Sequence, residues 1–281
     1  MKEATIVKPR EAAVPPSASD SAAVAVAEFV RYTLAIADVE VRKLLRDPTE
    51  VFTRSVQPTL WLLVFGQVFG RARAIPTGAM SYLDFMTPGV LAQSVLFTAI
   101  FYGIAVIWER DLGILQKMLV SPAYRGALVL GKAASASVRA VAQTIIIYVV
   151  ALLLGIHLRF SLGNILGVLV AVVLGAAVFS TFSLIVACVV KTRERFMGIG
   201  QVLTMPLFFA SNAIYPIAMM PDWLKAVARV NPLTYLVDAL RSLMVQGGES
   251  AFGYGHDIAI QVAVLIVLVA VAAWLYPSVA A

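Results

Sequence analysis

The segment NILGVLVAVVLGAAVFSTFSLIVACVV, residues 164–190, decides the fold class because it carries no charged side chain over its whole length. A helix needs roughly 20 apolar residues to cross the hydrocarbon core of a bilayer, and this segment exceeds that length. Comparable runs recur along the chain. Together they predict six membrane-spanning helices at about 51–70, 86–107, 133–157, 164–190, 196–219 and 257–277.

The composition of the 281-residue chain agrees with a membrane protein. Hydrophobic residues make up 60% of it and charged residues only 14%, with a mean hydropathy of +0.88. Soluble domains carry about 25% charged residues. We therefore expect an all-α, polytopic membrane protein with one transmembrane domain at 51–277. Pro58 and Pro206 fall inside the first and fifth predicted spans, where each can kink a helix.

Three segments outside the spans have patterns of their own. Residues 1–27 hold charges and adjacent prolines without an apolar core, which predicts a disordered cytoplasmic tail rather than a signal peptide. Residues 28–48 alternate apolar and charged positions at helical spacing, which predicts an amphipathic interfacial helix; a helix packed on a protein partner is the alternative. Residues 220–247 are rich in Pro and Gly around the amphipathic piece LTYLVDALRSLMV, which predicts an outer re-entrant helical hairpin.

The distribution of basic residues sets the orientation. If the amino terminus faces the cytoplasm, 15 of the 22 Lys and Arg residues fall on the inner side and 6 on the outer side, with Arg139 inside the third span. We therefore expect both termini in the cytoplasm. The net charge of +6 is then explained by membrane orientation and by contacts with anionic headgroups of the lipid bilayer. No nucleic-acid partner is needed to explain it.

The stretch RGALVLGKA, residues 125–133, looks like a nucleotide-binding P-loop because Gly126 is followed after four residues by Gly131 and Lys132. A working P-loop needs a strand before the turn and a hydroxyl after the lysine to bind magnesium. Here the next residue is Ala133, and the preceding segment has helical character with a Ser-Pro break. The chain is therefore not expected to bind ATP. A single cysteine and two isolated histidines give no metal site.

Two blocks of sequence resemble the permease subunits of type-2 ABC exporters. The first is WERDLGILQKMLVSPAYRGALVLGK at 108–132, with the Glu-Arg-x-x-Gly, Leu-x-Ser-Pro, Arg and Gly-Lys pattern of the first cytoplasmic loop. The second, FFASNAIYPIAMMPDWLKAVARVNPLTYLVDALR at 208–241, is similar to the fifth-span and outer-hairpin region. The sequences of the two blocks most resemble those of daunorubicin-resistance-type drug exporters, and the resemblance covers roughly residues 50–275.

This resemblance implies a membrane subunit in the plasma (inner) membrane of a prokaryote, paired with a second permease copy as a homo- or heterodimer. ATP and Mg would bind to a separate ABC ATPase subunit, and this chain would hold no cofactor. In the family, the loop after the second span forms a coupling helix that rests in a cleft of the ATPase. The corresponding residues here are Glu109, Arg110, Asp111, Gly113, Lys117 and Arg125. Anchoring of the loop at the membrane surface is the alternative.

The predicted spans have no acidic residue near their centres, which disfavours a proton- or sodium-coupled carrier. Several polar residues could instead line a path for an amphipathic substrate: Gln93, Gln143, Gln201 and Asn212. Hydrogen bonds between helices are the simpler explanation of such residues. At the outer end, turn and hairpin residues could form an exit gate, or part of an interfacial aromatic belt: Tyr215, Pro216, Asn231, Pro232 and Tyr235.

The leading hypothesis is a transport subunit, not an enzyme, that exports an amphipathic drug, lipid or glycolipid from the cytoplasm or inner leaflet by using a separate ATPase. The resemblance to drug exporters further implies a role in multidrug export and antibiotic resistance. A polysaccharide or lipo-oligosaccharide exporter is an alternative with the same six-span plan. Two other classes stay open: an ATP-independent facilitative carrier or channel, and a non-transporting assembly protein. Dependence on an ATPase partner separates the exporters from these two.

Overall fold

The computed structural model describes most of the chain: residues 49–72, 75–78, 80–112, 125–190 and 192–275, together with Arg31, Asp38, Arg42 and Arg46. These residues form helices and no strand, which confirms the all-α prediction. Pairing of the β type occurs among them only as a single bridge between Leu158 and Val245.

The amino-terminal predictions fall mainly outside this part of the chain. The tail predicted at 1–27 lies outside the described residues, and so does most of the amphipathic helix predicted at 28–48. The four described residues of that helix are all charged, and each is helical and exposed. Asp38 and Arg42 form an ion pair of 2.9 Å one helical turn apart, as expected for one polar flank of a helix.

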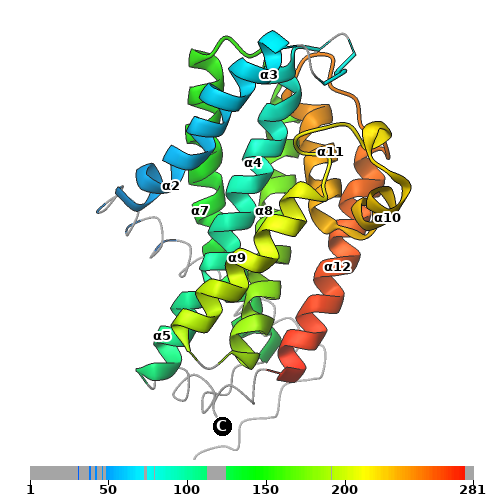
Figure 1. The fold of residues 1–281 in the computed structure, drawn as a ribbon. Coiled ribbons are helices and arrows are strands. Elements are labelled where there is room, and N and C mark those ends of the chain that lie inside the picture. Colours follow the sequence, from blue (N-terminus) through cyan, green and yellow to red (C-terminus); the bar gives the residue numbers. More distant parts are fainter. Residues whose placement is uncertain are drawn as a thin grey trace, which may run out of the picture.

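Four helical stretches are long and apolar enough to cross a membrane: Tyr82–Trp108, Val129–Leu153, Leu162–Val189 and Tyr254–Leu275. The first joins α4 (Tyr82–Phe101) to α5 (Gly103–Asp111), and the others belong to α7 (Arg125–Leu153), α8 (Leu162–Val189) and α12 (Tyr254–Leu275). α4, α7, α8 and α12 run side by side along the long axis of the molecule (Figure 1). They correspond to the second, third, fourth and sixth predicted spans.

The first and fifth predicted spans are helical but do not reach the same length and apolarity. The first consists of α2 (Thr49–Leu60), a π-helix η1 (Trp61–Gly66) and α3 (Gln67–Ala72) in direct succession. The fifth, predicted at 196–219, is α9 (Arg193–Phe209). Its predicted end at 219 is wrong, because the helix stops at Phe209. A total of six spans therefore stays a prediction.

The chain turns after α9 because side-chain hydrogen bonds replace the next helical ones. The Ser211 hydroxyl donates to the Phe208 carbonyl at 2.7 Å and accepts from the Ala213 N–H at 3.3 Å, a local pattern that competes with helix. The turn rests on α4 at Gly89, where a Cβ atom would lie 2.4 Å from the Ala213 carbonyl oxygen. Only glycine permits this approach of the two backbones.

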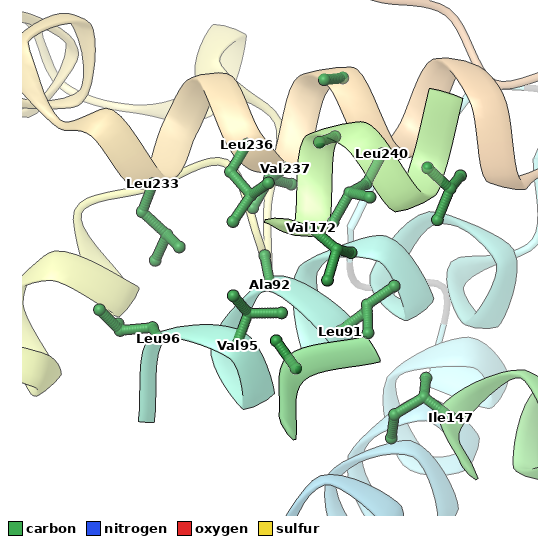
Figure 2. Close-up of a cluster of buried hydrophobic side chains, with 14 of the residues drawn as sticks. Leu91, Ala92, Val95, Leu96, Ile147, Val172, Leu233, Leu236, Val237 and Leu240 are labelled. Atoms are coloured by element: carbon green, nitrogen blue, oxygen red, sulfur yellow. The ribbon is translucent and has the colours of Figure 1, made fainter. Parts of the chain in front are cut away.

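The core contains side chains from α4, α7, α8 and α11 (Pro232–Met244) (Figure 2). Its labelled members are buried leucines, isoleucine, valines and one alanine: Leu91, Ala92, Val95, Leu96, Ile147, Val172, Leu233, Leu236, Val237 and Leu240. The amphipathic piece predicted at 233–245 is thus a buried helix of the bundle. Before it, α10 (Asp222–Val230) leaves Trp223 and Val230 exposed. Entry of the 220–247 hairpin into a membrane stays a prediction.

The bundle has two ends, seen at the bottom and top of Figure 1. The α5 end, as we name it, holds Trp108–Leu112, the link between α8 and α9, and the end of α12. The hairpin end holds residues 75–78, 80–81, 154–161 and 245–253. At the hairpin end the α7–α8 and α11–α12 connections are joined, since Arg159 N–H donates to Met244 O at 2.9 Å and Gln246 N–H to His157 O at 2.8 Å.

Candidate functional site

The predicted coupling residues lie in part at the α5 end. Arg110 and Asp111 are in the last turn of α5, where Arg193 of α9 forms a 2.9 Å ion pair with Asp111. The Arg193 guanidinium also stacks over the Trp108 ring, 3.7 Å from its centroid. Arg110 Nη1 donates to the Val190 carbonyl at 3.4 Å. These contacts join α5 to the start of α9.

The other predicted coupling residues are described only in part or not at all. Glu109 belongs to α5 and Arg125 is the first residue of α7, but their side chains are outside the described part. Gly113 and Lys117 lie outside the described residues altogether. Trp108 and Leu112 leave 49% and 66% of their surfaces exposed. An exposed apolar pair beside charged groups suits a protein interface.

The four residues predicted to line a substrate path do not converge on one cavity. Gln143 of α7 donates to the Ser55 hydroxyl of α2 at 3.0 Å, an ordinary bond between helices. Gln201 is exposed on α9. Asn212, in the turn after α9, is buried and its Nδ2 lies 3.4 Å from Asp238. Gln93 of α4 is buried, and its side-chain amide has no hydrogen-bond partner among the described residues.

Gln93 is one of the residues that line a cavity of about 170 Å³ between α2 and α4, whose lining is mainly polar and aromatic: Arg54, Gln57, Pro58, Gln93, Ser94, Phe97, Thr98 and Phe101. A second cavity of about 380 Å³ shares two of these residues and continues toward the α5 end: Arg54, Phe101, Tyr102, Ile104, Ala105, Trp108 and Arg139. The two cavities thus adjoin at Arg54 and Phe101.

The hairpin residues of the predicted gate form the joint between α10 and α11. Asn231 caps α11 by accepting from Leu233 N–H at 3.0 Å, and its Nδ2 donates to Leu207 O of α9 at 2.7 Å. Pro232 is the first residue of α11, and its carbonyl accepts from Gln261 of α12 at 2.8 Å.

The remaining residues of the predicted gate are Tyr235 on α11 and the pair Tyr215 and Pro216 in the segment after α9. The Tyr235 hydroxyl donates to the Arg229 carbonyl at 2.5 Å. The Tyr215 hydroxyl donates to the Phe209 carbonyl, and partial burial raises the pKa of this phenol above its ordinary value. Pro216 precedes the short 3-10 helix η2 (Ile217–Met219). Through Leu207 and Phe209, both parts of the gate are therefore attached to the last turn of α9.

A buried charged network at the hairpin end was missed by the sequence analysis. Asp238 and Arg241 of α11 are both buried, whereas Arg241 was counted in the sequence analysis only as one of the six basic residues on the outer side. Arg241 donates to Asn212 O at 2.7 Å and to Phe85 O at 3.3 Å, and its guanidinium lies 3.9 Å from the Phe85 ring centroid. The signal in the sequence was the opposite-charge pair three residues apart on one helix face.

The carboxylate of Asp238 is held by groups from the α11–α12 connection. Ser250 donates its hydroxyl to Asp238 Oδ2 at 2.6 Å, and Phe252 N–H donates to the same oxygen at 3.1 Å. Asp257, in the first turn of α12, lies 3.2 Å from the same hydroxyl. The network borders an open cavity of about 840 Å³ that Asp84 and His157 also line. Among the described residues, no three His, Cys, Asp or Glu side chains form a metal-binding group.

Comparison with known proteins gives a consistent result. A family model described as "ABC-2 type transporter" matches residues 31–245. The chain is 30% identical over 203 residues to transport permease ycf38 of Cyanophora paradoxa, covering 72% of this chain and 70% of that protein. It is 28% identical over 198 residues to the daunorubicin resistance ABC transporter permease protein DrrB1 of Streptomyces coeruleorubidus, covering 70% and 69%. It is 27% identical over 191 residues to nodulation protein J of Rhizobium leguminosarum bv. trifolii, covering 67% and 71%.

Proposed function

Because this chain belongs to the ABC-2 type transporter family, we propose that it is the membrane subunit of an exporter driven by a separate ATPase. Its cargo is an amphipathic drug, lipid or glycolipid, which it moves out of the cytoplasm or inner leaflet. Two relatives, named as a daunorubicin and a doxorubicin resistance permease, support the drug class. The chain itself carries out no hydrolysis, and ATP and magnesium bind to the partner.

The attachment of α9 at both its ends carries this proposal. At its start, Arg193 is bonded to Asp111 and stacked on Trp108, inside the predicted coupling segment. At its end, Leu207 and Phe209 hold the predicted gate residues through their carbonyls. A helix of 17 residues spans about 25 Å at 1.5 Å per residue. α9 thus links the coupling segment to the hairpin as one continuous helix.

These contacts support one order of events. The ATPase dimer closes on ATP and displaces the α5 end, which carries the predicted coupling residue Glu109. Because α5 and α9 are fastened together, the displacement moves α9 along its axis. The joint at Asn231 is pulled with it, and the hairpin opens the exit. The Asp238–Arg241 network keeps α11 fixed in the bundle meanwhile.

The second part of the proposal is a dimer of two permease chains. α2, η1 and α3 expose a row of large apolar side chains to the outside: Phe52, Val56, Leu60, Leu63, Val64, Phe65 and Val68. A surface of this kind is stable only against lipid or another apolar protein surface. Together with the family, it supports contact with the bilayer and with a second copy along this helix.

ATP-driven uptake of daunorubicin into inside-out membrane vesicles tests the proposed function. The vesicles contain the chain and its ATPase, and accumulation is followed by the drug's fluorescence. Arg193→Ala removes both the ion pair and the ring contact, so uptake should fall at least fivefold while the ATPase stays bound. Arg195→Ala, an exposed arginine of the same helical turn, is the matched control and should transport normally.

Two outcomes would contradict the proposal at different points. Equal uptake by the Arg193 and Arg195 variants would show that α9 does not transmit the motion. Accumulation that continues without ATP would identify a facilitative carrier instead.

A further inference from the structure

The side chain of Gln93 has an unusual environment for a buried amide. It is only 2% exposed, and neither its Oε1 nor its Nε2 has a partner among the described residues. An amide buried without hydrogen bonds costs about 1–3 kcal/mol, and most such groups in proteins are satisfied. Gln143, by contrast, is bonded to Ser55. The unused donors and acceptor of Gln93 indicate a polar group that enters from outside the chain.

The space in front of Gln93 is large enough for such a group and leads away from it. The two adjoining cavities, of about 170 and 380 Å³, extend along α4 and α5 from Gln93 to Trp108. We name them together the α2–α5 groove. The fifteen helical steps between these residues correspond to roughly 22 Å. This length matches an extended acyl chain with its headgroup better than a small soluble ion.

The charged side chains that line the α2–α5 groove in the described part of the chain are arginines. Arg54 lines both cavities and Arg139 lines the second, whereas neither Asp nor Glu occurs among the described lining residues. Arg139 lies over the Tyr102 ring, 5.3 Å from its centroid. Guanidinium groups bind phosphate and carboxylate oxygens through paired hydrogen bonds. An arginine within a membrane-spanning helix marks a functional site more often than a structural one.

The remaining lining is apolar and aromatic. Phe97 and Phe101, one turn apart on α4, have ring centroids 6.0 Å apart, and Trp108 extends this surface toward the α5 end. Thr98 adds a hydroxyl between the two phenylalanines. Such a wall accepts hydrocarbon, while the arginines and Gln93 accept oxygen atoms.

We propose that the α2–α5 groove binds an amphipath with an anionic headgroup, a phosphate or carboxylate carried on an apolar chain. The headgroup lies against Arg54 and Gln93, and the apolar chain lies against Phe97 and Phe101. As a binding site the groove stands on its own geometry. Its role in holding a lipid cargo during export rests on the proposed function and concerns the lipid class of that cargo, not a cationic drug such as daunorubicin.

Direct binding to the purified full chain tests this inference without the ATPase. Native mass spectrometry in detergent measures the affinity for dioctanoyl phosphatidylglycerol, for dioctanoyl phosphatidylcholine with the same chains, and for inorganic phosphate. The anionic lipid should bind at least tenfold more tightly than the zwitterionic one, and millimolar phosphate should not displace it. Equal affinity for both lipids would overturn the proposal, and so would full displacement by phosphate, which would indicate a site for a soluble anion.

Two variants test the named residues. Arg54→Gln and Gln93→Leu should each weaken phosphatidylglycerol binding about tenfold. Arg229→Gln and Gln67→Leu change exposed residues outside the groove, and they should bind as the parent does. The melting temperature of Gln93→Leu should stay equal or rise, because the substitution removes an unsatisfied buried amide. A stable Gln93→Leu variant with unchanged affinity would overturn the assignment.

This experiment also separates the two proposals. If the parent chain binds phosphatidylglycerol selectively but shows no ATP-driven transport, the proposed function is refuted and the groove is not. Transport by a protein without that selectivity would refute the groove alone.

Discussion

Replacement of Arg241 by methionine should destabilise the bundle strongly. Arg241 makes a 2.7 Å bond to Asn212 O, longer bonds to Phe85 O, and a close contact with the Phe85 ring. Methionine fills similar volume but leaves the buried carbonyl of Asn212 without its donor, removes a second donor from the helical carbonyl of Phe85, and leaves Asp238 without its nearby positive charge. Removal of one partner from a buried charged pair costs about 3–5 kcal/mol, and the loss here should lie in that range.

Thermal unfolding of the purified chain in detergent measures this loss. At the roughly 2–4 °C per kcal/mol typical of large domains, Arg241→Met should lower the melting temperature by about 6–20 °C. Arg241→Lys keeps the charge but cannot reach both carbonyls in the same planar arrangement, so its loss should be about half as large. Arg229→Met, on the exposed face of α10, is the control and should change stability by less than about 0.5 kcal/mol. If Arg241→Met melts within about 1 °C of the parent, the network does not hold α11 in place.

Three further predictions concern single contacts. Gly89→Ala should cost about 1–3 kcal/mol in thermal unfolding, because its new methyl group would clash with the Ala213 carbonyl; a gain in stability would contradict the close approach of the two backbones. Asn231→Ala removes a helix cap and a bond to α9, and a loss of about 1–3 kcal/mol is expected, with Asn231→Asp recovering the cap alone. Asp111→Asn weakens a half-exposed ion pair, so stability should change by less than about 1 kcal/mol, while ATP-driven transport falls; a large drop in melting temperature would mean that the pair is structural.

The four long spans could be predicted because each has enough apolar residues to exceed the bilayer thickness. The end of α9 could not be predicted in the same way. Residues after Phe209 continue to read as apolar, and the turn there depends on Ser211 and on the close contact of Ala213 with Gly89. That contact joins segments more than a hundred positions apart, so composition alone carries no sign of it.

The candidate sites show the same limit for polar residues. Gln93, Gln143 and Gln201 look equivalent in the sequence, each one amide in an apolar stretch. In the structure, the first lacks a partner, the second bonds to Ser55, and the third is exposed. Whether a glutamine is unpartnered, hydrogen-bonded or exposed depends on which helix lies beside it. That neighbour is set by tertiary packing rather than by the local sequence.

The buried network at Asp238 was hidden for a related reason. The amphipathic pattern of α11 predicted part of an outer re-entrant hairpin, without partners for its polar side chains. In the structure, the polar face of α11 meets the hydroxyl of Ser250 and the N–H of Phe252, which the α11–α12 connection brings back over the helix. The prediction that Asp84 and Asp257 lie at span ends is correct, since each is in the first turn of its helix, but both are buried there.

Co-purification tests the central claim most directly, that this chain is driven by a separate ATPase through its α5 end. The tagged chain is extracted from its native membrane in mild detergent, and the proteins that stay bound are identified by mass spectrometry. We predict a soluble protein with a complete P-loop in equal amount, which is lost from Glu109→Arg although that variant keeps the parent's melting temperature. A well-folded chain that purifies alone and still moves its cargo in vesicles without ATP would contradict the account.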